Sequence, residues 1–189
     1  MNLKELILKN RSYRRFDQSV PVSMELLREM VEAARLSGSA RNMQPLRYML
    51  FNEGSDCAGI FPTLAWAGYL KEWPGPVDGE RPSAYIVQLG DLDLTDDWWC
   101  DDGIAAQSML LTAVEKGFGG CIIGSIQREK LRSLLNIPEH YKIIQVLALG
   151  KPAEEVVIDE VVDGDIKYWR DENEIHHVPK RSLQELIIS

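Results

Sequence analysis

Hydrophobic residues follow two periods along the chain, which predicts helices alternating with strands. Apolar positions three or four residues apart indicate helices at Asn2–Lys9, from Ser23 to about Leu36, and at Asp102–Lys116. The last of these stretches is apolar on most of its sides. We therefore expect it to be a central helix, buried nearly all round and packed on a sheet.

Short apolar runs between turn-forming residues predict strands at Arg47–Asn52, Ser83–Asp91 and Lys142–Gly150. The glycine-rich run Gly117–Ser125 stops the central helix and leads into a further strand. At 189 residues the chain is expected to form one domain, residues 1–189, which is long enough to bury a core.

The shorter elements have weaker signals. Ser23 is the expected N-cap of the second helix. Ser125 is the expected N-cap of a short helix that begins directly after it. Residues 151–189 are expected to form a C-terminal arm and helix. Its acidic part, Glu154–Asp165, is either an edge segment or an arm over a partner subunit, and the apolar positions of residues 183–187 predict a short amphipathic helix.

Residues 54–82 are the least regular part, because prolines and glycines alternate there with aromatic side chains. A linker would be polar, so the aromatic content suggests a lid-like segment over a binding site. Lys71 or Trp73 would then reach a substrate. The alternative is a surface loop held in place by its own aromatic residues.

The overall charge narrows the class of partner. A formal net charge of -8 argues against nucleic acid or an anionic membrane as the partner. The N-terminus lacks the apolar run of a signal peptide, and no apolar run is long enough to span a bilayer. The three cysteines, which are far apart, suit reduced thiols in a cytoplasmic protein.

Against this acidic background, Asn10–Phe16 gathers three arginines and a serine within five positions. Planar guanidinium groups pair bidentately with phosphate, and a serine hydroxyl adds a further hydrogen bond. The segment therefore indicates a phosphate site. The alternative is a solvated charged turn.

A second candidate segment is the loop Ser37–Pro45, in which small and amide side chains predominate. Asn42 and Gln44 present both donors and acceptors, which suits the edge of a heterocycle. The alternative is a plain connector built on an Asx-turn.

No catalytic set of side chains is visible. The acids within Asp96–Asp102 lack ligand spacing to a histidine or further carboxylate, so we interpret them as helix-start residues, which favour a helix N-terminus, rather than as a metal site. The chain also lacks zinc spacing, a Walker loop and a nucleophile–base set. His140, His176 and His177 have no partner pattern and receive no role. This absence is typical of an enzyme whose chemistry belongs to a cofactor.

Two of these segments together resemble the nitroreductase family of FMN-dependent homodimeric flavoproteins. That family opens with Arg-Ser-x-Arg and a nearby aromatic, which stand here as Arg11–Arg14 and Phe16. Its next signature, Ser-x-x-Asn-x-Gln-Pro, stands here as Ser39–Pro45. The chain departs from the family pattern at three positions, each of which differs from a frequent family residue: Asn10, Gly38 and Leu46.

The resemblance implies a fold and a set of cofactor contacts. The fold is α+β, a three-layer α/β/α sandwich with a mixed, mostly antiparallel sheet flanked by helices, and it is dimeric. The FMN phosphate and ribityl chain would contact Arg11, Ser12 and Arg14, and the basic pair Lys180 and Arg181 would meet the same phosphate. The backbone at Ile123 and Gly124 would lie near the reactive edge of the flavin ring. The loop side chains Ser39, Asn42 and Gln44 would approach the ring, partly across the dimer interface.

The resemblance also implies the reaction. NAD(P)H would transfer a hydride to flavin N5, and a nitroaromatic, a quinone or a similar small acceptor would then take the electrons, with no catalytic side chain supplied by the protein. Two alternatives remain open. One is a specialised flavoprotein of the same fold that fragments flavin, dehalogenates or reduces an activated alkene. The other is a flavin-binding protein without significant turnover.

Overall fold

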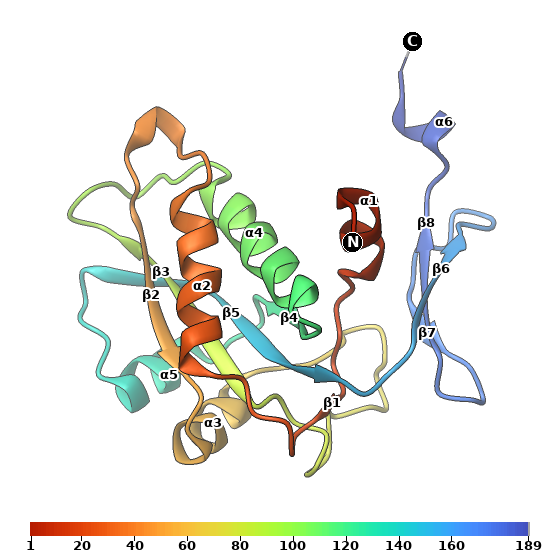
Figure 1. The fold of residues 1–189 in the computed structure, drawn as a ribbon, viewed down its shortest axis with the longest axis horizontal. Helices are drawn as coiled ribbons and strands as arrows, with labels where there is room; N and C mark the ends of the chain where they lie inside the picture. Colours follow the sequence, from red (N-terminus) through yellow and green to blue (C-terminus); the bar gives the residue numbers. More distant parts are fainter. Residues whose placement is uncertain (189) are drawn as a thin grey trace.

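The computed structural model describes residues 1–188, and its centre is an antiparallel sheet built around one long strand (Figure 1). That strand, β5 (Tyr141–Pro152), pairs along one side with β3 (Ala84–Asp91), which in turn pairs with β2 (Leu46–Phe51). On its other side β5 pairs with β4 (Gly119–Ile123), and its last two residues pair with β1 (Phe16–Asp17). The predicted strands are therefore confirmed.

Helices cover both faces of this sheet. On one face lie α2 (Met24–Arg35) and α4 (Asp101–Glu115). The other face carries α3 (Gly54–Ile60), the 3₁₀ turn Phe61–Thr63 and α5 (Arg128–Leu135). The result is the expected three-layer α+β sandwich.

The core follows from the alternation of side chains along the strands. In β3 every residue is buried, which requires cover on both faces. Ile86 points into the cluster under α2 and α4, whereas Tyr85 and Val87 point into the cluster under α3 and α5. Met109 of the central helix is fully buried, but Ile104 and Gln107 are exposed, so the helix is not buried nearly all round as predicted.

A second, smaller sheet lies beside the first and contains the C-terminal part of the chain (Figure 1). We call β6 (Val156–Glu160), β8 (His176–Lys180) and β7 (Trp169–Arg170) the C-terminal sheet. β6 and β8 run parallel, and β7 is antiparallel to β8. The sheet lies alongside α1 (Leu3–Lys9), and α6 (Leu183–Leu186) extends beyond it.

Three local expectations need correction. Ser125 does not cap α5, because the helix begins only at Arg128. The Ser125 carbonyl instead accepts a hydrogen bond from the Ala65 amide. Residues 54–60 form a helix, in which Cys57 and Ile60 are buried, although Gly54 and Gly59 lie within it. Of the acids in 96–102, only Asp101 and Asp102 lie in the first turn of α4.

None of the helices within residues 1–188 combines the length and the apolar character that crossing a bilayer requires.

Candidate functional site

The arginine segment and strand β8 line a common cavity of about 270 Å³, which we call the basic cavity. Its cationic side chains are Arg11 and Arg14 from the N-terminal part and Lys180 from the C-terminal part. The remaining lining residues are Asn10, Ser12, Tyr168, His176 and Val178. Two segments some 165 residues apart in the chain thus meet around one space, as the resemblance implied for Lys180, whereas Arg181 is not among the lining residues.

Backbone pairing brings these segments together. Ser12 forms a parallel bridge with Gly120 at the start of β4, and the Tyr13 amide donates to the Gly120 carbonyl at 3.1 Å. Along β8, His176, Val178 and Lys180 share the face that lines the cavity, because side chains alternate along a strand. Arg181 follows the strand and its Nη1 lies 3.4 Å from Glu185.

The three cations of the basic cavity carry unneutralised charge. Within residues 1–188, none of Arg11, Arg14 and Lys180 forms an ion pair with a carboxylate. Arg11 instead donates to the Ile7 carbonyl at 2.8 Å, and its buried Nε atom has no partner among the described residues. Three cations that lack a carboxylate partner in the described part of the chain, one of which also has a buried donor without a partner, fit a phosphate dianion.

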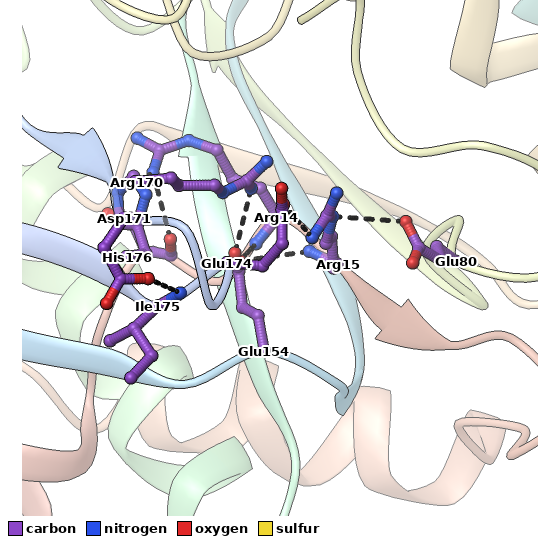
Figure 2. A network of polar contacts seen from close by, with 10 residues as sticks. Arg14, Arg15, Glu80, Glu154, Arg170, Asp171, Glu174, Ile175 and His176 are labelled. Carbon is purple, nitrogen blue, oxygen red and sulfur yellow. Dashed lines mark hydrogen bonds and ion pairs between the residues drawn. The ribbon is translucent and has the colours of Figure 1, made fainter.

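The neighbouring charged side chains, in contrast, form ion pairs with one another (Figure 2). The Glu154 side chain is only 2% exposed; it accepts the backbone amides of Arg14 and Arg15 and lies 3.0 Å from Nη2 of Arg170. Arg15 pairs with Glu80 and Glu174 at 3.3 and 2.6 Å. This network joins the N-terminal segment to the C-terminal sheet.

Trp73 takes part in that junction. The Arg170 guanidinium lies 4.3 Å from a Trp73 ring centroid, and that of Arg15 lies 6.0 Å away. Lys71 is exposed. The expectation that Lys71 and Trp73 line a substrate pocket stays a prediction. Trp73 has a structural role here, because its ring lies near two guanidinium groups.

His176 is the residue that the sequence reasoning missed. It is 1% exposed, and its Nε2 lies 3.2 Å from Nη1 of Arg14. Burial, and then the charges of Arg14 and Arg170, lower the pKa of His176 to about 4. Its neighbour His177 faces away, with Nδ1 2.7 Å from Asp159. The available signal was the period of two that places His176 on the same face as Lys180.

The loop after α2 lines a different cavity of about 230 Å³, to which Ser39 and Gln44 contribute and Asn42 does not. Ser39 Oγ donates to Asp101 at 2.6 Å and accepts the Gln44 amide at 2.9 Å. The Ala40 amide donates to the second oxygen of Asp101 at 2.9 Å. Asp101 is 3% exposed, so a residue expected only to start a helix is the anchor of this loop.

That anchor offsets an unusual backbone. Arg41, Asn42 and Gln44 all have φ between 50° and 56°, a backbone conformation that residues other than glycine rarely adopt. Two hydrogen bonds from the loop to a buried carboxylate hold this conformation. The exposed amide of Asn42 is thereby presented outward from a fixed turn.

Strand β4 runs from the basic cavity to the backbone at Ile123 and Gly124. Gly120 contacts the arginine segment, and Gly124 lies four residues further along, about 13 Å at strand rise. Ile123 is buried, whereas Gly124 is exposed and its carbonyl accepts from Arg128 at 3.3 Å. Among residues 1–188, no group of three histidine, cysteine or acidic side chains is placed to hold a metal ion.

Comparison with known proteins gives a family for this arrangement. The model of the Nitroreductase family matches residues 7–67 and 82–151. The NADH dehydrogenase of Thermus thermophilus is 27% identical over 184 residues, which covers 82% of this chain and 89% of the relative.

Solved structures have the same fold. The FMN-dependent nitroreductase of Clostridium difficile R20291 superposes with a TM-score of 0.65 at 22% identity, covering 81% of this chain and 89% of that one. The nitroreductase family protein of Streptococcus pneumoniae TIGR4 gives a TM-score of 0.69 at 17% identity, covering 85% and 96%.

The family match leaves out residues 68–81 and 152–189. In the structure parts of these two segments pack against each other. The rings of Tyr69 and Tyr168 lie 4.9 Å apart, and Arg170 stacks on Trp73. The half of the basic cavity that β8 lines therefore comes from a part of the chain outside the match.

Proposed function

The chain belongs to the nitroreductase family, and from this premise we propose that it is an FMN-dependent oxidoreductase that uses NAD(P)H to reduce nitroaromatics, quinones or similar small acceptors. The observation that carries the proposal is the basic cavity, where three unpaired cations from both ends of the chain converge. A doubly charged phosphate ester is the ligand that this charge arrangement favours.

In this proposal, Arg11, Arg14 and Lys180 bind the phosphate, and Ser12 adds a hydroxyl contact. The ribityl chain would follow β4 from Gly120 toward Gly124, since the strand links the phosphate end to the expected ring position. Arg181 contributes to the surrounding positive charge, although in the structure it bonds to Glu185.

When bound, FMN supplies the redox chemistry, since flavin N5 accepts a hydride from NAD(P)H and the acceptor later takes the electrons. The chain's own part is to bind, orient and shield. The backbone at Ile123 and Gly124 would border the reactive edge, and no side chain of the protein needs to act as nucleophile or metal ligand. Protons would come from water.

A second copy of the chain would complete the site. Ser39 and Gln44 line a cavity that shares no lining residue with the basic cavity. We therefore propose a homodimer in which the Ser39–Gln44 loop of one protomer approaches the flavin held by its partner. Exposed apolar side chains on α1, α4 and α6 would be covered in such a dimer: Leu3, Ile7, Leu8, Ile104, Leu183 and Leu186.

The test is spectroscopic. Purified protein, reconstituted with FMN, should be yellow, should lose its flavin absorbance when NADH or NADPH is added without oxygen, and should regain it on addition of a nitroaromatic. A protein that does not take up FMN contradicts the whole proposal. A yellow protein that neither nicotinamide bleaches contradicts the reductase and leaves a flavin-binding protein.

A further inference from the structure

Arg14 is held at the wall of the basic cavity by neutral groups. Its Nη1 atom lies 3.2 Å from the Ser12 carbonyl oxygen and 3.2 Å from Nε2 of His176. The Tyr168 ring lies beside the guanidinium, with the Arg14 Cζ 4.8 Å from the ring centroid. All four residues line the cavity. Such partners restrict the direction of the guanidinium without neutralising it, whereas a carboxylate would cancel its charge.

The hydrogen bond between Arg14 and His176 allows one arrangement of protons. A guanidinium only donates, so Nε2 of His176 must accept, and the proton of the neutral ring must then be on Nδ1. The low pKa of His176, a result of burial and of Arg14 and Arg170, keeps the ring neutral near pH 7. The imidazole is therefore a permanent acceptor for Arg14 under ordinary conditions.

His176 is itself firmly placed. Its backbone amide donates to the Glu155 carbonyl at 2.9 Å, and it is the partner of Val156 in the pairing of β8 with β6. The centroid of its ring lies 5.2 Å from that of Tyr168. A side chain on a paired strand, packed against an aromatic ring, orients its partner more accurately than one on a free loop.

We propose that His176 is a positioning residue that aims the Arg14 guanidinium at the cofactor phosphate, with Tyr168 as the surface on which that guanidinium rests. This inference rests on the proposed function, because it assigns the ligand of the basic cavity as the phosphate of FMN. Both residues lie outside the stretches that the family model matches, so this device belongs to the C-terminal sheet.

The test compares FMN with riboflavin, which has the same ring and ribityl chain but no phosphate. Affinities are measured by titrating each flavin into the apo protein and following flavin fluorescence. His176→Leu should weaken FMN binding about tenfold, the loss of one hydrogen bond to a charged group, and change riboflavin binding less than twofold. His176→Gln should retain most of the FMN affinity, since its amide oxygen can still accept from Arg14.

A double-mutant cycle separates positioning from a general effect on structure. In an Arg14→Ala background, His176→Leu should cause no further loss of FMN affinity, because the residue acts through Arg14. His177→Leu is the matched control: it alters the adjacent histidine, which faces Asp159, and should leave the ratio of FMN to riboflavin affinity unchanged.

The outcomes are distinct. An equal loss of FMN and riboflavin binding, an unchanged FMN affinity in His176→Leu, or a further loss in the Arg14→Ala background each overturns the positioning role while the proposed function stands. If the unaltered protein binds neither flavin, the proposed function fails and this inference fails with it. If it binds FMN no more tightly than riboflavin, the basic cavity does not hold the phosphate and the inference is overturned.

Discussion

The central sheet and the C-terminal sheet differ in the kind of contact that holds each of them in place. Apolar side chains fill both faces of the central sheet, and Ile86, Met109 and Leu147 have no exposed surface. The C-terminal sheet is attached to the rest of the chain through charged and aromatic groups. Glu154, Arg170 and Trp73 form that junction.

This difference bears on function. Apolar burial stabilises a domain without specifying much about direction, since it is proportional to area. A junction of charges and rings is directional, because each contact requires a particular geometry. The residues that attach the C-terminal sheet lie next to those that line the basic cavity. The attachment and the shape of the cavity therefore depend on one another.

The largest effect is expected from removing the carboxylate at the centre of the junction. Glu154→Ala would leave the Arg170 guanidinium, whose side chain is 9% exposed, without its ion-pair partner. The backbone amides of Arg14 and Arg15 would also lose their acceptor. We expect a loss of about 3–5 kcal/mol in the free energy of unfolding, measured by urea denaturation.

Two variants check this expectation. Glu154→Gln keeps an acceptor oxygen for the amides and should lose less. Glu155→Ala removes the adjacent, exposed carboxylate and should change stability by less than about 0.5 kcal/mol. Equal stabilities for Glu154→Ala and Glu155→Ala would show that the junction contributes little.

The second expectation contrasts two neighbouring arginines. Arg14 lines the basic cavity, whereas Arg15 is paired with Glu80 and Glu174. Arg14→Ala should lower FMN affinity by about 3 kcal/mol, because charge-assisted bonds to the phosphate are lost. Arg15→Ala should leave FMN affinity within about twofold and act on stability instead. Titration of FMN into both apo variants makes the comparison, and the same affinity in both would remove Arg14 from the phosphate site.

The third expectation uses pH. The folded pKa of His176 is about 4, below the ordinary 6.5, so the unfolded chain binds the proton more readily. Burial is the largest cause of the lowered pKa, and the charged groups that add to it are Arg14, Arg170 and His177, all cationic when charged. Stability from this residue is complete above pH 6.5 and falls as the pH drops toward 4. Between pH 7.5 and pH 5 the loss should be about 2 kcal/mol.

His176→Gln isolates that contribution from those of the many carboxylates. Unfolding free energies of the two proteins, measured from pH 7.5 to pH 4, should converge as the pH falls. Parallel profiles would mean that His176 titrates normally in the folded state.

Much of the fold was predictable because its signals are local. The spacing of apolar residues predicted the central helix and strand β5, and Ser23 does accept the Leu26 amide as an N-cap. The arginine segment could also be identified from the sequence, since clustered guanidinium groups are conspicuous in an acidic chain.

Other features had no local signal. The helix at residues 54–60 was missed because it contains Gly54 and Gly59, which are poor helix formers, whereas the burial of Cys57 and Ile60 favours it. Asp101 resembled any helix-start acid until the structure placed the Ser39 hydroxyl 2.6 Å from it. That Lys180 lines the basic cavity while Arg181 lies near Glu185 depends on where β8 ends.

The amino-acid sequence by itself determined the longer helices and the strands of the central sheet from β2 to β5, and it marked the cluster of arginines near the N-terminus, because period and local charge are properties of neighbours in the chain. Only the tertiary structure decided that Arg14 would lie against His176 with its charge unpaired while Arg15 and Arg170 are neutralised. The physical reason is that a guanidinium's partners are set by the packing of distant strands, and no local pattern records which acids will reach it.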